Sequence, residues 1–148
     1  MKTKIQTQKL MSGFLYFTDD TPTKDPNQLS LGLNQIKRNG EYEPLSLFEG
    51  IVKPLEKITT PKGKKTNEIP IAKLKFDIRE SEDYFACTFN LFLFPDNTID
   101  GSVKYYNPKE LDKHFSGIYH KSVRGKLIIC GQWRARNNAV DYFFIELS

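Results

Sequence analysis

The sequence KLIICGQWRAR (126–136), followed by NNAVD (137–141) and YFFIEL (142–147), decides the fold class. Alternate positions of 126–136 separate into a more polar, basic set and an apolar set, the latter consisting of Leu127, Ile129, Gly131, Trp133 and Ala135. This period of two is typical of a strand with one buried side. The asparagines of 137–141 tolerate the left-handed backbone of a short turn, and 142–147 has the aromatic and β-branched content of a strand. We therefore expect a β-hairpin closing a β-rich domain.

The composition favours one soluble, mainly β domain. A chain of 148 residues is long enough to bury a core, and 11 Phe and 7 Tyr favour strands. No apolar segment follows the N-terminal lysines, as a signal peptide would require, and the apolar run around 91–94 is too short to span a membrane. We expect an intracellular, cytoplasmic protein.

The net charge of +4 is unevenly distributed along the chain. Residues 1–50 are neutral, whereas 51–75 hold seven lysines against two glutamates. Residues 76–112 hold three basic and eight acidic side chains, and 113–148 hold six basic and two acidic. Two basic blocks separated by an acidic one fit a polyanion-binding face opposite an acidic face, although a dispersed solvating surface would have a similar pattern.

Motifs of catalysis and metal binding are missing from the sequence. It contains no glycine-rich phosphate loop, nucleophile elbow or HExxH helix, so we expect no enzyme activity and no cofactor. Cys87 and Cys130 are predicted to be buried free thiols, with a disulfide between neighbouring strands as the alternative. His114 and His120 lack ligand spacing and are interpreted as surface residues, so no metal site is predicted.

The regular elements become clear after residue 44. In 69–79, one face carries apolar residues while Lys73 and Lys75 lie on the other. Asn107 can cap a helix that has Pro108 at its first position, which predicts a helix over 107–115. Residues 1–44 are interpreted as an N-terminal extension, either a hairpin or an arm, preceding a domain over 45–148. The expected strands are 13–18 within the extension, then 45–58, 69–79, 84–94, 126–136 and 142–147, with a short strand over 102–106.

This order resembles the oligonucleotide-binding (OB) fold, in which a helix lies between the third and fourth strands of a Greek-key barrel. The resemblance is carried by the glycine-bearing strand 48–52, the capped helix 107–115, and the closing segments 124–129 and 142–147. It implies a mainly β, five-stranded OB-like barrel with one short helix. The 44-residue extension and the stretch 98–106 depart from the family pattern.

The resemblance implies binding of single-stranded nucleic acid on the second and third strands and the adjoining loops. Lysines would contact phosphates and aromatic rings would stack on bases, without sequence specificity. In size and organisation the chain resembles accessory strand-binding proteins of phages and other mobile elements, which act in replication, recombination or repair and often self-associate. DNA is favoured over RNA, with a homodimer or higher oligomer through 1–44 and replication or recombination proteins as expected partners. The predicted binding residues are Lys53, Lys62, Lys64, Lys65, Lys73, Lys75, Arg79, Tyr84, Phe92, Trp133, Arg134 and Arg136.

Each of these residues also has a purely structural interpretation. The lysines could maintain solubility or protect a strand edge. Tyr84 and Phe92 could be covered by residues 1–44, and Trp133 shares the core face of its strand. The alternative function is a protein-interaction module, such as an inhibitor, adaptor or assembly subunit, that uses an exposed aromatic β face. Binding to a polyanion should weaken steeply with salt, whereas a mainly apolar protein contact should not.

Overall fold

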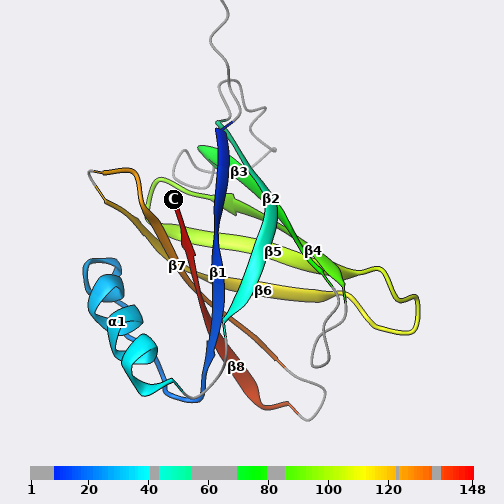
Figure 1. Ribbon diagram of the computed structural model, residues 1–148, viewed down its shortest axis with the longest axis horizontal. Coiled ribbons are helices and arrows are strands. Elements are labelled where there is room, and N and C mark those ends of the chain that lie inside the picture. Colours follow the sequence, from blue (N-terminus) through cyan, green and yellow to red (C-terminus); the bar gives the residue numbers. More distant parts are fainter. Residues whose placement is uncertain (1–8, 41–43, 55–69, 80–85, 123, 135–137) are drawn as a thin grey trace, which may run out of the picture.

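The computed structural model describes residues 9–40, 44–54, 70–79, 86–122, 124–134 and 138–148 (Figure 1). For 9–11 and 46–54 it describes the backbone alone. A short 3-10 turn, Pro26–Gln28, leads into the helix α1, Leu29–Asn39. The strands are β1 (Lys9–Thr18), β2 (Leu45–Pro54), β3 (Ala72–Ile78), β4 (Cys87–Leu93), β5 (Thr98–Tyr105), β6 (Lys113–Lys121), β7 (Leu127–Arg134) and β8 (Val140–Leu147).

The described strands form a closed barrel in which each strand pairs antiparallel with the next and β1 pairs with β8. The mainly β character is confirmed, and so is the hairpin of β7 and β8, but the short helix that the structure describes is α1 in the N-terminal extension. The strand number and connectivity differ from the prediction, because the described chain forms eight consecutive strands and not a five-stranded Greek key. The stretch 98–106, which did not fit the OB pattern, supplies β5.

The helix predicted over 107–115 is not formed, and this prediction was wrong. Asn107 does cap a turn, since its side-chain Oδ1 accepts the backbone N–H of Lys109 at 3.0 Å and its carbonyl accepts that of Glu110 at 3.0 Å. The turn does not continue because the chain pairs with β5 from Lys113 onward. Leu111, expected on the apolar helix face, is 73% exposed. Strand pairing therefore overrides a local capping signal.

The N-terminal region contributes to the barrel, which corrects the expected boundary at residue 44. Gly13 of β1 pairs with both Leu47 of β2 and Leu147 of β8. A Cβ at this glycine would lie 1.7 Å from the carbonyl oxygen of Glu146, so only glycine fits this close approach. Residues 9–18 are thus a strand of the barrel, and the rest of the described N-terminal extension supplies α1.

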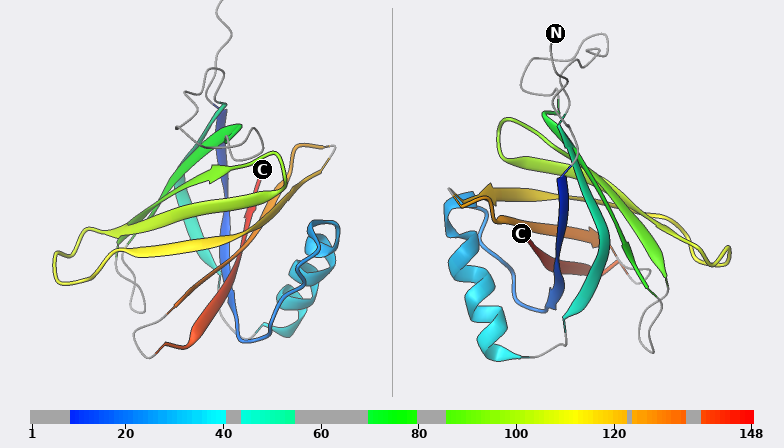
Figure 2. Two further views of the ribbon diagram at one scale, coloured as in Figure 1. Left: turned by 180° about the vertical axis from the view of Figure 1, so that it is seen from behind. Right: turned by 45° about the horizontal axis from the view of Figure 1, so that its top comes forward.

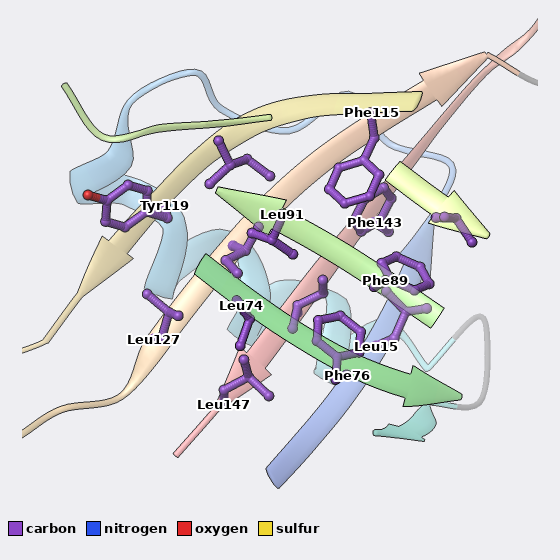
Figure 3. Packing of buried hydrophobic residues seen from close by; sticks show 14 of the residues in the cluster. Leu15, Leu74, Phe76, Phe89, Leu91, Phe115, Tyr119, Leu127, Phe143 and Leu147 are labelled. Atoms are coloured by element: carbon purple, nitrogen blue, oxygen red, sulfur yellow. The ribbon is translucent and has the colours of Figure 1, made fainter. Parts of the chain in front are cut away.

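Aromatic and aliphatic side chains fill the barrel interior (Figure 3). The rings of Phe76 and Phe89 stack with their centroids 4.9 Å apart, and Phe143 meets Phe115 edge-on at 5.4 Å. A Cβ at Gly131 would lie 2.4 Å from the Phe143 ring, so the glycine provides the space that this ring occupies. The described interior is a packed core, as is common for small barrels.

A second apolar cluster lies outside the barrel, where α1 covers β7 and β8 (Figure 2). Leu29 and Leu33 of the helix are buried there, and the helix is capped by Gly40, which has a φ of 61°. Their neighbours on the outer barrel surface are Tyr16, Ile128, Cys130 and Phe144. In the described part of the chain, no helix has the length and apolar character needed to cross a bilayer.

Candidate nucleic-acid interface

The outer surface of β3 and β4 carries basic, polar and aromatic side chains. We call Ile71, Lys73, Lys75, Asn90 and Phe92 the β3–β4 wall. Lys73 pairs in register with Phe92, and Lys75 with Asn90. The intervening residues Leu74, Phe76 and Leu91 point into the core and are buried. The packing of these core residues holds the wall residues outward, as the period of two predicted.

Lys73 and Phe92 form the centre of the wall. The Nζ of Lys73 lies 5.9 Å from the Phe92 ring centroid, a distance suited to a cation–π interaction. Phe92 is 36% exposed and Ile71 is 48% exposed. The apolar face of α1 packs on β7 and β8. The helix of the N-terminal extension therefore does not cover Phe92, although the structural interpretation of Phe92 required such a cover.

The row formed by Lys73 and Phe92 continues onto the strands on either side. Lys53 of β2 is the register partner of Lys73. Asp100 of β5 is the partner of Phe92, and Ser102 is the partner of Asn90. The Oδ1 of Asp100 lies 2.8 Å from the Nε2 of His114. Asp100 and Ser102 were missed as site residues, although the alternation of buried and exposed positions in 98–105 could have placed both on the outer face.

Several predicted binding residues lie outside the described part of the chain. These are Lys62, Lys64 and Lys65 in the β2–β3 connection, Tyr84 in the β3–β4 connection, and Arg136 beyond β7. The β2–β3 connection leaves the barrel at Pro54 and returns next to β4, where the Ile71 N–H donates to the Leu93 carbonyl at 2.7 Å. Its two ends therefore adjoin the wall.

The two described arginines among the predicted binding residues lie at the end of the barrel opposite the β2–β3 connection. Connections in an up-and-down barrel alternate between its two ends, so the β2–β3 and β7–β8 connections are at opposite ends. Arg134, at the end of β7, donates from Nη1 to the Asn138 carbonyl at 3.3 Å. Arg79 follows β3 at that same end. The described binding residues therefore do not form the single surface implied by the OB resemblance, because Arg134 lies on a strand distant from β3 and β4, whereas Arg79 follows β3 itself.

Trp133 belongs to the barrel interior and is 5% exposed. Its Nε1–H donates to Asp141 Oδ2 at 3.0 Å, and its ring centroid is 4.8 Å from that of Phe143. The Nζ of Lys113 lies 4.7 Å from the indole ring. Because these contacts cover the ring, a base cannot stack on Trp133 as expected. The core interpretation of this residue is the correct one.

Both cysteines are buried free thiols, which confirms the sequence interpretation. Burial raises the pKa of Cys87 to about 12, with the Asp77 carboxylate adding to the effect and Lys113 opposing it. Burial also raises the pKa of Cys130 to about 12. At neutral pH both groups are therefore protonated and poor nucleophiles.

A groove of about 340 Å³ lies where residues 21–24 cross the outer surface of β5 to β8. Ser116, Ile118, Gln132 and Tyr142 contribute to its lining. None of the predicted binding residues lines it. The groove and the β3–β4 wall are therefore different surface features.

Comparison with known proteins gave no match to a protein-family model, to a curated protein or to a solved structure. The function must therefore be inferred from the surface chemistry of the chain. The β3–β4 wall is the surface on which the structure brings together the largest number of described predicted residues, namely Lys73, Lys75 and Phe92, with Lys53 beside them in register.

Proposed function

We propose that the protein binds single-stranded nucleic acid, with DNA favoured over RNA, on the β3–β4 wall. The observation that carries this proposal is the lysine ammonium of Lys73 beside the exposed ring of Phe92 on a face that α1 leaves bare. Sequence-tolerant strand binding needs cations for the phosphates and aromatic faces for the bases. Both groups are present here side by side.

The spacing of the wall residues suits an extended strand. Lys73 and Lys75 are two residues apart on β3, so their Cα atoms are separated by about 6.6 Å. This is comparable with the separation of successive phosphates in an extended nucleic acid. With the backbone along β3, the bases would lie over β4, where Phe92 offers a stacking surface and Asn90 offers hydrogen bonds. Lys53, Lys62, Lys64 and Lys65 would supply further cations for phosphates.

Such binding is non-catalytic and would keep strands unpaired in replication, recombination or repair. The phage or mobile-element role and self-association remain predictions from the sequence. The alternative is a protein-interaction module, which is favoured by the exposure of Ile71 and Phe92 on one face. A protein partner would bury these two side chains and leave the lysines at the rim.

The primary test is fluorescence polarisation of a labelled single-stranded DNA 20-mer of mixed sequence, at about 50 mM and about 200 mM salt. Neutralisation of three or four phosphates predicts a slope of log K against log salt of about −2 to −3. The variant K73E/K75E should bind at least about tenfold more weakly, and Phe92→Ala about five- to tenfold more weakly. The charge-matched control is K24E/K109E, which changes exposed lysines away from the wall.

The lysines outside the described residues need their own variant. Changing Lys62, Lys64 and Lys65 together to Glu should abolish binding while circular dichroism shows an unchanged fold. Unchanged affinity would remove this connection from the site. If the wild-type protein binds no oligonucleotide even at low salt, the proposed function is wrong and the wall is a candidate protein-binding surface.

A further inference from the structure

We infer that the wall discriminates between bases, and that Asp100 is the residue that does so. The base stacked on Phe92 would be one with an exocyclic amino group, namely cytosine, adenine or guanine, in preference to thymine or uracil. This inference rests on the proposed function and specifies the ligand of the same site.

The inference begins with the order of charges across the strands. Lys53, Lys73, Phe92 and Asp100 occupy successive strands in register, from β2 to β5. Neighbouring strands lie about 4.8 Å apart, so Lys73 on β3 and Asp100 on β5 stand on opposite sides of Phe92 along the row. Asp100 repels phosphates while the lysines attract them. The phosphate backbone of a bound strand is therefore held over β3, and the edge of the base on Phe92 that lies farther from this backbone faces β5.

Asp100 has acceptor capacity for this base edge. Its side chain is 52% exposed, and its Oδ1 lies beside His114. A carboxylate has about four lone-pair sites on two oxygens, so Oδ2 can accept a hydrogen bond while Oδ1 stays with His114. Aspartate accepts from the N4 amino group of cytosine, and the amino groups of adenine and guanine offer the same chemistry. Thymine and uracil present carbonyl oxygens at the equivalent edge, where a carboxylate is repelled.

The neighbouring position on the wall should be less selective. There the row consists of Lys75, Asn90 and Ser102. An amide and a hydroxyl each donate and accept, so they can pair with any base edge. We therefore expect the preference to be confined to one nucleotide of the bound strand.

The test compares the affinities for labelled oligo(dC) and oligo(dT) of equal length at pH 7.5 and low salt. The wild-type protein should bind oligo(dC) about five- to tenfold more tightly, which is at the lower end of the range for a base-specific contact. In Asp100→Asn, the amide can donate to a thymine carbonyl, so the ratio should fall to within about twofold. Asp112→Asn makes the same change of charge in the β5–β6 connection and should keep the wild-type ratio.

The outcomes separate the two proposals. Equal affinity of the wild-type protein for both oligonucleotides, with binding still lost in K73E/K75E, would overturn the base preference and leave the proposed function standing. A wild-type ratio retained in Asp100→Asn would overturn the role of Asp100. The absence of binding to either oligonucleotide would overturn both the preference and the function.

Discussion

Two outer faces of the same barrel differ in the side chains that they present. Tyr16, Ile128, Cys130 and Phe144 lie beneath α1 and are at most 9% exposed. Lys75 and Phe92 on the β3–β4 wall are exposed, although the inward faces of both regions pack in the same core. The inward positions therefore specify the barrel, while the outward positions determine what covers it. The apolar outer face is covered by α1, whereas the helix does not pack on the basic, aromatic face.

The largest expected effect comes from removing an aromatic ring beneath α1. Phe144→Ala should lower the free energy of unfolding by about 3–5 kcal/mol, because it leaves a cavity between the helix and the barrel. Phe92→Ala is the control on the bare face and should cost less than about 1 kcal/mol. Urea unfolding followed by Trp133 fluorescence measures both. Similar losses would show that the two faces do not differ in packing as described.

A smaller loss is expected from the helix side of the same contact. Leu33→Ala removes a side chain that is 1% exposed and should cost about 2–4 kcal/mol. Leu31, on the same helix, is 59% exposed, so Leu31→Ala should change stability by no more than about 0.5 kcal/mol. Urea unfolding of both variants tests whether α1 is held by its buried face. Equal effects of the two substitutions would argue against the docking of α1 through Leu33.

The ion pairs at the edge of the covered face should produce a pH dependence. Burial alone would raise the pKa of Glu146, but hydrogen bonds from Lys37 and Lys126 outweigh it, and the pKa lies below the usual value. The Lys37 and Lys126 Nζ atoms are 2.7 and 3.0 Å from its carboxylate oxygens. A lowered pKa stabilises the fold above the unfolded-state value, and this contribution is lost as pH falls through the folded-state pKa.

Glu146→Gln should therefore cost about 1 kcal/mol at pH 7, and this difference should shrink as the pH falls below about 4. Urea unfolding across this range is the measurement, with Asp112→Asn as a surface control. A cost that persists unchanged at pH 3 would assign the effect to packing and not to charge.

The smallest expected signal is the thiol labelling of the native protein. Both cysteines are buried with a pKa of about 12, so iodoacetamide at pH 8 should modify neither at an appreciable rate. In Leu33→Ala, Cys130 should react first, because it lies under α1, whereas Cys87 lies in the barrel core. Mass spectrometry identifies the labelled residue. Earlier labelling of Cys87 would mean that the barrel opens more readily than the helix detaches.

The sequence predicted what depends on local alternation and missed what depends on distant pairing. The inward positions of β3, such as Leu74, followed from the period of two in 69–79 and are confirmed. The closure by β1 could not be predicted, because it depends on contacts with β8 more than a hundred residues away. Strand β6 was not predicted, because the local capping signal at Asn107 favoured a helix and Gly117 weakens strand propensity.

For the candidate site too, the sequence predicted what depends on local alternation and missed what depends on distant pairing. Lys73, Lys75 and Phe92 could be placed on one face because they occupy alternate positions of strands joined by a single connection. The separation of Arg134 from these residues could not be predicted, because the number of strands between them determines the end of the barrel at which each connection lies. Asp100 was missed because its strand was predicted to begin only at residue 102.

The pairing of the first and last strands has a consequence for how the order of the strands along the chain could be changed. Strands β1 and β8 pair antiparallel as consecutive strands do, and Ser12 and Ser148 next to the end of this ladder exchange backbone N–H···O hydrogen bonds at 3.2 and 3.0 Å. In the described barrel, each strand has two neighbouring strands, so none of them is an edge strand. A circular permutant that opens in the β6–β7 connection and links β8 to β1 would therefore retain the β3–β4 wall intact while reversing the order in which the two outer faces are synthesised.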